Sequence, residues 1–257
     1  MNFTFALAQF ELFVLILIRL ASFVFAAPFF NMANVPNRVK IGFSFCLTIM
    51  VYSLFPDMSV EYNGMIEYAI IVAEEIIVGI LLGAVSSFCV QIIMFAGKII
   101  DMDIGISMAQ LYDPTTRMQV GIMGNFYYYM MMLLLIISGM HQYLVSAIVE
   151  TYRVIPIGGV KFGAGIYTGI IGFVSDFFVI GFRIALPVFA AILMLNCVLA
   201  ILAKVSPQMN MFVVGMQLKI FVGIIVVTFT LVMLPSVSNF ILDEIEKMFA
   251  ILVRGMS

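Results

Sequence analysis

The sequence predicts an all-α, multi-helix integral membrane protein, and its composition supports this fold class in two ways. Of its 257 residues, 64% are hydrophobic and only 10% are charged, whereas soluble domains have roughly 25% charged residues. So few polar side chains cannot cover the surface of a soluble enzyme, and disordered chains are also far more polar. Helices are expected because an open sheet leaves backbone groups unpaired in lipid. The net charge of −2 gives no basic surface for nucleic acid.

About six apolar segments follow one another along the chain. They are Phe3–Phe30, Ile41–Phe55, Met65–Gly97, Met118–Val149, Ile166–Ala203 and Leu218–Leu242. A helix crosses the hydrocarbon core of a bilayer with about 20 apolar residues. The second segment is therefore short for a span, and the fourth and fifth are too long for upright spans. Because proline interrupts helical hydrogen bonding, we expect kinks near Pro28 and Pro187.

The last fifteen residues continue the sixth segment in a different pattern. Ile245, Met248, Phe249 and Leu252 recur at helical spacing between charged residues. Such spacing places apolar side chains on one face of a helix. The sequence therefore predicts that the chain ends in an amphipathic extension of the sixth helix.

The residue pattern does not suggest catalysis or metal binding. The single histidine, His141, lies in an apolar segment, and no serine occurs in a G-x-S-x-G elbow. The stretch Asp101–Gly105 has the acids of a calcium loop but lacks the glycine and glutamate at their required positions. We therefore predict that the protein is not an enzyme and uses no cofactor.

Three charges inside apolar segments call for partners, because charge is costly in lipid and usually faces protein. Arg19 lies in the first segment, and Asp176 and Arg183 lie in the fifth. Seven residues separate the latter two, which puts them on nearly the same helical face. They could line the ion path of a secondary transporter. They could instead form ion pairs between helices or subunits, which is the interpretation we favour.

Two further patterns concern packing and gating. Gly79 and Gly83, like Gly165 and Gly169, are one helical turn apart, which lets membrane helices approach closely. The segment Lys98–Arg117 mixes acids with methionine and isoleucine between two long apolar segments. Irregular backbone at membrane depth is tolerated where it is buried in protein or lines a cavity. This segment is either a re-entrant loop that occludes a pore or a structured turn at the membrane surface.

The chain resembles the FliR family of flagellar export-gate proteins, and more distantly the equivalent subunit of virulence type III secretion. Spread over nearly the whole chain, the residues that carry the resemblance include Arg19, Val35–Lys40, Glu75, Gly79, Gly83, Gly105, Asp113-Pro114, Pro207-Gln208-Met209-Asn210 and Lys219. The resemblance implies one membrane domain over residues 1–257, built from long, kinked, antiparallel helical hairpins. It also implies a place in the bacterial cell membrane, in the flagellar basal body.

The resemblance further implies partners and site residues. The family forms a closed entrance together with FliP and FliQ, with an FlhB-type export protein nearby, and unfolded flagellar proteins leave through it. The loop that would plug the pore comprises Gly105, Ile106, Ser107, Met108, Ala109, Gln110, Leu111, Tyr112, Asp113 and Pro114. The residues expected to pack helices or subunits are Arg19, Glu75, Gly79, Gly83, Asp176, Arg183, Pro207, Gln208, Met209, Asn210 and Lys219.

Overall fold

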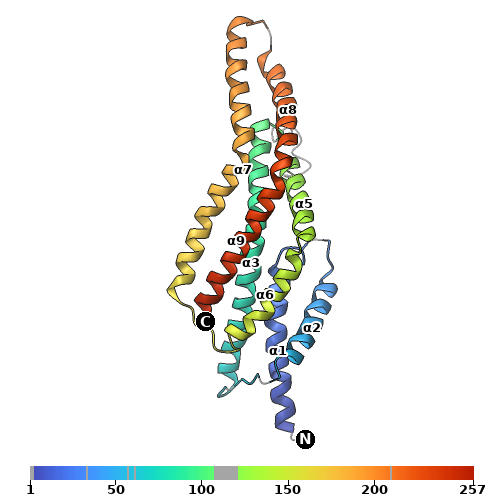
Figure 1. Ribbon diagram of the computed structural model, residues 1–257, viewed down its shortest axis with the longest axis vertical. Coiled ribbons are helices and arrows are strands. Elements are labelled where there is room, and N and C mark those ends of the chain that lie inside the picture. Colours follow the sequence, from blue (N-terminus) through green and yellow to red (C-terminus); the bar gives the residue numbers. More distant parts are fainter. Residues whose placement is uncertain (1–2, 33, 57, 61, 107–120, 209) are drawn as a thin grey trace. The chain divides into compact units, whose positions relative to one another are not determined.

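Helices form every regular element among the residues that the computed structural model describes, which are 3–32, 34–56, 58–60, 62–106, 121–208 and 210–257 (Figure 1). They are α1 (Phe3–Ala26), α2 (Asn37–Leu54), α3 (Met65–Ile104), α5 (Ile122–Ile137), α6 (Met140–Val154), α7 (Ala164–Val205), α8 (Met211–Thr230), the 3₁₀ turn η1 (Leu231–Met233) and α9 (Leu234–Met256). The predicted all-α fold class is confirmed.

Four helical stretches are long and apolar enough to cross a membrane, fewer than the six apolar segments. They are Gln9–Ala26, Met65–Ile104, Gly165–Val205 and Phe212–Met256, and α5 together with α6 would make a fifth. The second predicted segment does form a helix, α2. However, α2 begins with polar residues and buries Lys40, Ser44 and Thr48, so it is less apolar than a span.

Two helices are much longer than a bilayer requires. α3 has 40 residues and α7 has 42, so each is about 60 Å long, twice the ~30 Å hydrocarbon core. α7 continues through Pro187 without ending. If either helix crossed the membrane upright, about half of its length would lie outside the hydrocarbon core.

Two of the predicted apolar segments are each divided between two helices: the fourth, expected to be too long for one upright span, and the sixth, expected to be one helix. The fourth segment divides into α5 and α6 at Ser138 and Gly139, and Gly139 adopts a φ of 80° that suits glycine. The sixth divides at η1, between α8 and α9. The predicted amphipathic end is confirmed: α9 reaches Met256 and buries Ile245, Met248, Phe249 and Leu252.

The helices group into two compact units. The first unit comprises residues up to 89, 138–173 and 242–257. In it α1 packs along α2, where Phe13 makes edge-on ring contacts with Phe45 at 5.6 Å and Tyr52 at 6.1 Å. Phe249 of α9 makes a similar contact with Phe23 of α1. Aromatic and aliphatic side chains thus form the core of this unit.

The second unit comprises residues 90–137 and 174–241. α3 and α5 approach closely there, because Gly97 faces the backbone of Gly124. Asp101 of α3 accepts hydrogen bonds from the first-turn amides of α5, from Met123 at 3.0 Å and from Gly124 at 3.2 Å. These bonds satisfy amides that a helix start leaves without intrahelical partners. The prediction of one domain over residues 1–257 remains a prediction.

Candidate functional site

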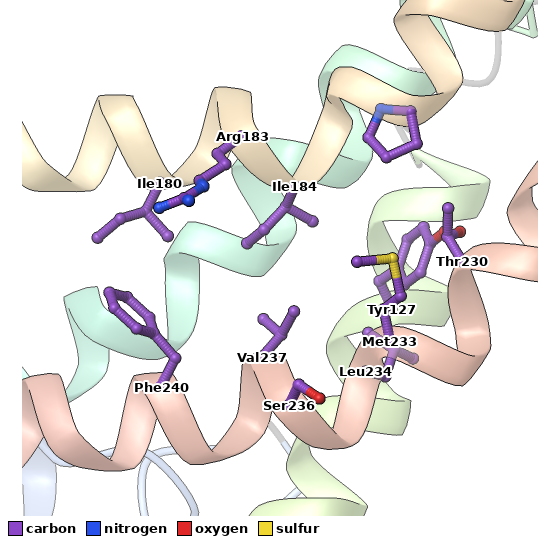
Figure 2. A pocket seen from close by; sticks show the side chains of 11 residues that line it. Tyr127, Ile180, Arg183, Ile184, Thr230, Met233, Leu234, Ser236, Val237 and Phe240 are labelled. Atoms are coloured by element: carbon purple, nitrogen blue, oxygen red, sulfur yellow. The ribbon is translucent and has the colours of Figure 1, made fainter.

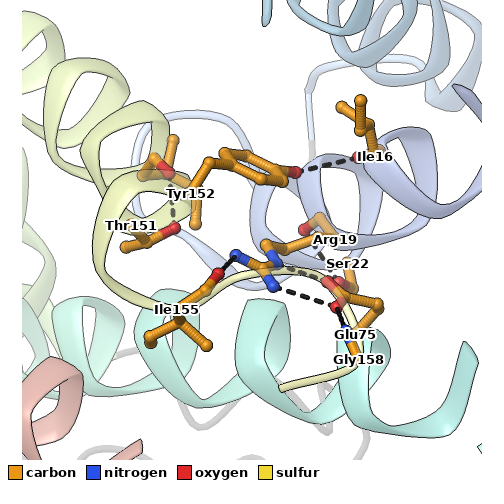
Figure 3. Close-up of polar contacts among 9 residues, drawn as sticks. Ile16, Arg19, Ser22, Glu75, Thr151, Tyr152, Ile155 and Gly158 are labelled. Atoms are coloured by element: carbon orange, nitrogen blue, oxygen red, sulfur yellow. Dashed lines mark hydrogen bonds and ion pairs between the residues drawn. The ribbon is translucent and has the colours of Figure 1, made fainter. Parts of the chain in front are cut away.

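A buried ion pair between α1 and α3 is the central polar contact of the first unit (Figure 3). The side chains of Arg19 and Glu75 are both 0% exposed. Arg19 Nη2 donates to Glu75 Oε1 at 2.9 Å, and Arg19 Nε donates to Glu75 Oε2. This two-point geometry is the strong form of an arginine–carboxylate contact. It fixes the rotation and register of the two helices against each other.

Further groups surround this pair and satisfy its remaining bonding capacity. Arg19 Nη1 donates to the carbonyl of Ile155 at 3.1 Å, and the amide of Gly158 donates to Glu75 Oε1 at 3.4 Å. The Arg19 guanidinium also lies 4.4 Å from the ring centroid of Tyr152, whose hydroxyl donates to the Ile16 carbonyl at 3.1 Å. The pair therefore joins α1, α3, α6 and the connection that follows α6 (Figure 3).

Two glycines of α3 let α1 come close enough for this pair to form. A Cβ atom added to Gly79 would lie 2.0 Å from Ser22 Oγ and 2.4 Å from the carbonyl oxygen of Arg19. One added to Gly83 would lie 2.7 Å from the Ala26 Cβ. Both contacts are far shorter than van der Waals distances. Glu75, Gly79 and Gly83 are successive turns of one α3 face, so the ion pair and the glycine contacts belong to one interface.

Only the beginning of the predicted plug loop can be described. Gly105 ends α3 with a φ of 88°, and its amide donates to the Met102 carbonyl at 3.2 Å. Ile106 follows it in a turn. The other predicted plug residues, namely Ser107, Met108, Ala109, Gln110, Leu111, Tyr112, Asp113 and Pro114, lie outside the described residues, as does Met209.

The predicted packing residues after α7 lie in a turn and in α8. Pro207 and Gln208 are exposed, and the Asn210 side chain caps α8 by accepting from the Phe212 amide at 3.2 Å. Lys219 is half-buried and lines a cavity of about 230 Å³ together with Asp103. One oxygen of Asp103 is buried and has no hydrogen-bond partner among the described residues.

The charges of α7 differ from each other in their surroundings. Asp176 is half-buried, whereas Arg183 is exposed and lines a cavity of about 310 Å³ in the second unit (Figure 2). The walls of this cavity come from α5, α7, α8, η1 and α9, and most are apolar. Sequence spacing alone placed Asp176 and Arg183 on one face, but it did not indicate this cavity.

Comparison with known proteins adds the family. Residues 10–245 match the family described as bacterial export proteins, family 1. The chain belongs to this family. Eight relatives to which the chain is similar are named flagellar biosynthetic protein FliR, so the resemblance drawn from the sequence is confirmed.

Three of these relatives illustrate how evenly the similarity extends. The Escherichia coli (strain K12) protein is 26% identical over 240 residues, which is 93% of this chain and 92% of the relative. The Bacillus subtilis (strain 168) protein is 29% identical over 226 residues, 84% of each chain. The Aquifex aeolicus (strain VF5) protein is 24% identical over 237 residues, 92% of each chain. The similarity to the export family thus covers nearly all of the spans.

Sequence reasoning did not identify several residues of the ion-pair site in this export-family chain. Tyr152, Ile155 and Gly158 contact Arg19 or Glu75, but two of them do so through backbone atoms, which carry no residue-type signal. Asp101 was considered only as a calcium ligand, although it caps α5. Because Asp101 lies 22 residues before Met123, no local sequence pattern indicated this second role.

Proposed function

We propose that this chain is a structural and gating subunit of the flagellar protein-export apparatus. The observation that carries the proposal is the match of residues 10–245 to an export family, together with near full-length similarity to proteins named FliR. The helices described above support it because they make a membrane-embedded component. The described polar contacts, such as the Arg19–Glu75 pair, join helices and thus suit a structural subunit.

In this proposal the chain assembles with FliP and FliQ around a closed pore in the bacterial cell membrane, at the flagellar basal body. An FlhB-type protein lies nearby, and unfolded flagellar proteins are the cargo. Exposure supports an assembly: in an apolar 18-residue stretch of each span, only 17% of the residues are buried within this chain for α7 and for α8–α9, against 56% for α3. Because α7 is about 60 Å long, a single bilayer core cannot cover all of its exposed apolar surface.

The pore plug is the more specific part of the proposal. We assign it to the segment Gly105–Pro114, because this segment starts at the left-handed end of α3 and mixes apolar with polar side chains. Replacing Ile106–Tyr112 with seven glycine and serine residues keeps the chain length but removes the plugging side chains. Expressed with FliP and FliQ, this variant should assemble and should let ions or small solutes leak across the membrane.

The control is the same kind of replacement at residues 56–60, in the connection between α2 and α3. Leak is measured as dye or ion release from liposomes that contain the purified complex. The expected result is leak from the Ile106–Tyr112 variant and none from the control. An assembled complex that stays tight with the plug segment replaced would contradict the plug assignment while leaving the export role in place.

The alternative of a secondary transporter that uses Asp176 and Arg183 makes a different prediction. A transporter would take up its substrate or ion when the purified chain alone is placed in liposomes. An export subunit would show no such uptake alone and would form a stable complex on expression with FliP and FliQ. Uptake by the single chain that disappears in Asp176→Asn or Arg183→Gln would decide for the transporter.

A further inference from the structure

The cavity beside Arg183 has a polar patch and an apolar wall within the second unit. Its volume is about 310 Å³, and ligand pockets begin at roughly this size. Arg183 reaches into it from α7, opposite Ser236 and Phe240 of α9 (Figure 2). The hydroxyls of Tyr127 and Thr230 lie at the other end and bond each other at 2.6 Å. The remaining lining is aliphatic, so the cavity suits a ligand with one anionic group and a hydrocarbon part.

Two helix irregularities that line the cavity explain why neighbouring helices do not fill it. Pro187 lies one turn after Arg183 and has no amide hydrogen, so the Arg183 carbonyl lacks its usual helical donor. On the other wall, Met233 belongs to the 3₁₀ turn η1, which separates α8 from α9. A helix with a proline and a helix pair with a tightened turn do not pack as regular ridges and grooves. A persistent cavity between them follows.

The Arg183 guanidinium forms no ion pair or hydrogen bond with any described residue. In a segment this apolar, an unpaired cation is expensive and normally has an anionic partner. Residues 184–203, which follow Arg183 in α7, carry no charged side chain and form about 30 Å of helix. That length matches one hydrocarbon core. Arg183 thus lies at one end of an apolar stretch of membrane length, where a lipid phosphate would lie, and the cavity runs from it along this stretch past Ile184 towards Tyr127 (Figure 2).

We propose that this cavity binds one anionic phospholipid, with the lipid phosphate on Arg183 and an acyl chain along the aliphatic wall towards Tyr127. A guanidinium forms two-point hydrogen bonds with phosphate oxygens, which makes it a good partner for this group. The proposal assigns Arg183 to lipid in place of the subunit contact expected from the sequence. It requires only a membrane-inserted chain, so it stands apart from the export function.

Native mass spectrometry of the purified full chain tests this, with phosphatidylglycerol and phosphatidylcholine offered at equal concentration. We expect one phosphatidylglycerol per chain to be retained in preference to phosphatidylcholine. Arg183→Gln should weaken phosphatidylglycerol retention about fivefold, the effect of one basic residue on anionic lipid. Ser236→Phe, which fills the cavity and leaves the charge in place, should weaken it as well, and it serves as the second variant if Arg183→Gln does not fold.

The matched control is Lys204→Gln, which removes another exposed cation of α7 outside the cavity. It should leave lipid retention unchanged. Equal retention of the two lipids, or unchanged retention in both cavity variants, would overturn the proposal. So would an Arg183→Gln chain that keeps its lipid but no longer co-purifies with FliP and FliQ, because the cavity would then be a protein contact.

Discussion

At the scale of single residues, the Arg19–Glu75 pair is held by more bonds than an isolated ion pair would be. Its charges cancel, and Ile155, Gly158 and Tyr152 satisfy the groups that remain. A buried pair of this kind can be replaced by apolar side chains with little loss of stability, whereas removal of one partner leaves an uncompensated charge. The two kinds of change therefore test its role separately.

Glu75→Leu alone should lower the free energy of unfolding by about 3–5 kcal/mol, because Arg19 keeps its charge in a fully buried site. The double variant Arg19→Met, Glu75→Leu should lose clearly less, because no buried charge is left. Thermal unfolding of the purified chain in one detergent measures both.

The matched control is Arg153→Gln, which breaks an exposed pair with Glu150 whose side chains are 60% and 68% exposed. Its effect should stay below about 1 kcal/mol. If Glu75→Leu proved no more destabilising than this control, the ion pair would not hold α1 to α3.

A second residue-scale prediction concerns Tyr62, which donates a hydrogen bond to Glu11 at 2.6 Å from outside the spans. This bond raises the pKa of the Tyr62 phenol above its ordinary value, and desolvation and the Glu11 charge act in the same direction. The stabilisation is present below about pH 10 and is lost as the pH rises through the raised pKa.

Glu11→Ala should therefore lower the pKa of Tyr62 towards the ordinary tyrosine value. Carbon-13 NMR of labelled tyrosine measures this pKa, with Tyr62→Phe to assign the signal. Glu67→Gln changes a nearby carboxylate that does not bond Tyr62 and should leave its pKa unchanged. An unaltered pKa in Glu11→Ala would show that the hydrogen bond does not persist in solution.

The residue-scale contacts could be predicted only in part. Arg19 stands out because it is a charge within an apolar segment, and Glu75 was singled out by the family resemblance. Adjacent Glu74 and Glu75 point in different directions on a helix, so the pairing depends on how α3 is rotated. That rotation is set by Gly79 and Gly83 against α1, a contact between segments more than 50 residues apart.

At the scale of elements, the glycine face of α3 sets the distance between α1 and α3. Gly79→Ala should destabilise the chain by about 1–3 kcal/mol, because its Cβ would meet the Arg19 carbonyl, a backbone atom that cannot rotate away. The measurement is again thermal unfolding in detergent.

Gly172→Ala in α7 is the matched control, because a Cβ there has nothing within 4 Å. It should be neutral or slightly stabilising, since alanine favours a helix over glycine. Equal effects of the two substitutions would contradict the close α1–α3 contact.

The positions of helices were easier to predict than their ends. Apolar runs located α1, α2, α3 and α7, because burial in lipid or protein requires them. The break at η1 was missed although Pro235, the second residue of α9, marks it, because proline is favoured in the first turn of a helix and disfavoured in its interior. Gly139 was visible in the sequence, but a single glycine inside an apolar helix is compatible with continuation.

At the scale of the whole molecule, the many apolar residues lie in two kinds of environment. Part of it is buried within the chain, as in the α3 span, and part remains exposed on α7, α8 and α9. Where helices are longer than the bilayer is thick, their exposed apolar surface needs partner proteins as well as lipid. The 21 methionines suit such contacts because their side chains adapt to irregular neighbours.

Co-purification tests the central claim most directly. The tagged chain is expressed with FliP and FliQ, extracted from membranes in mild detergent and analysed by size and by mass spectrometry. The account predicts one stable complex that contains all three proteins and is absent when an unrelated multi-span protein replaces this chain. A chain that inserts in the membrane and elutes alone, without FliP or FliQ, would contradict it.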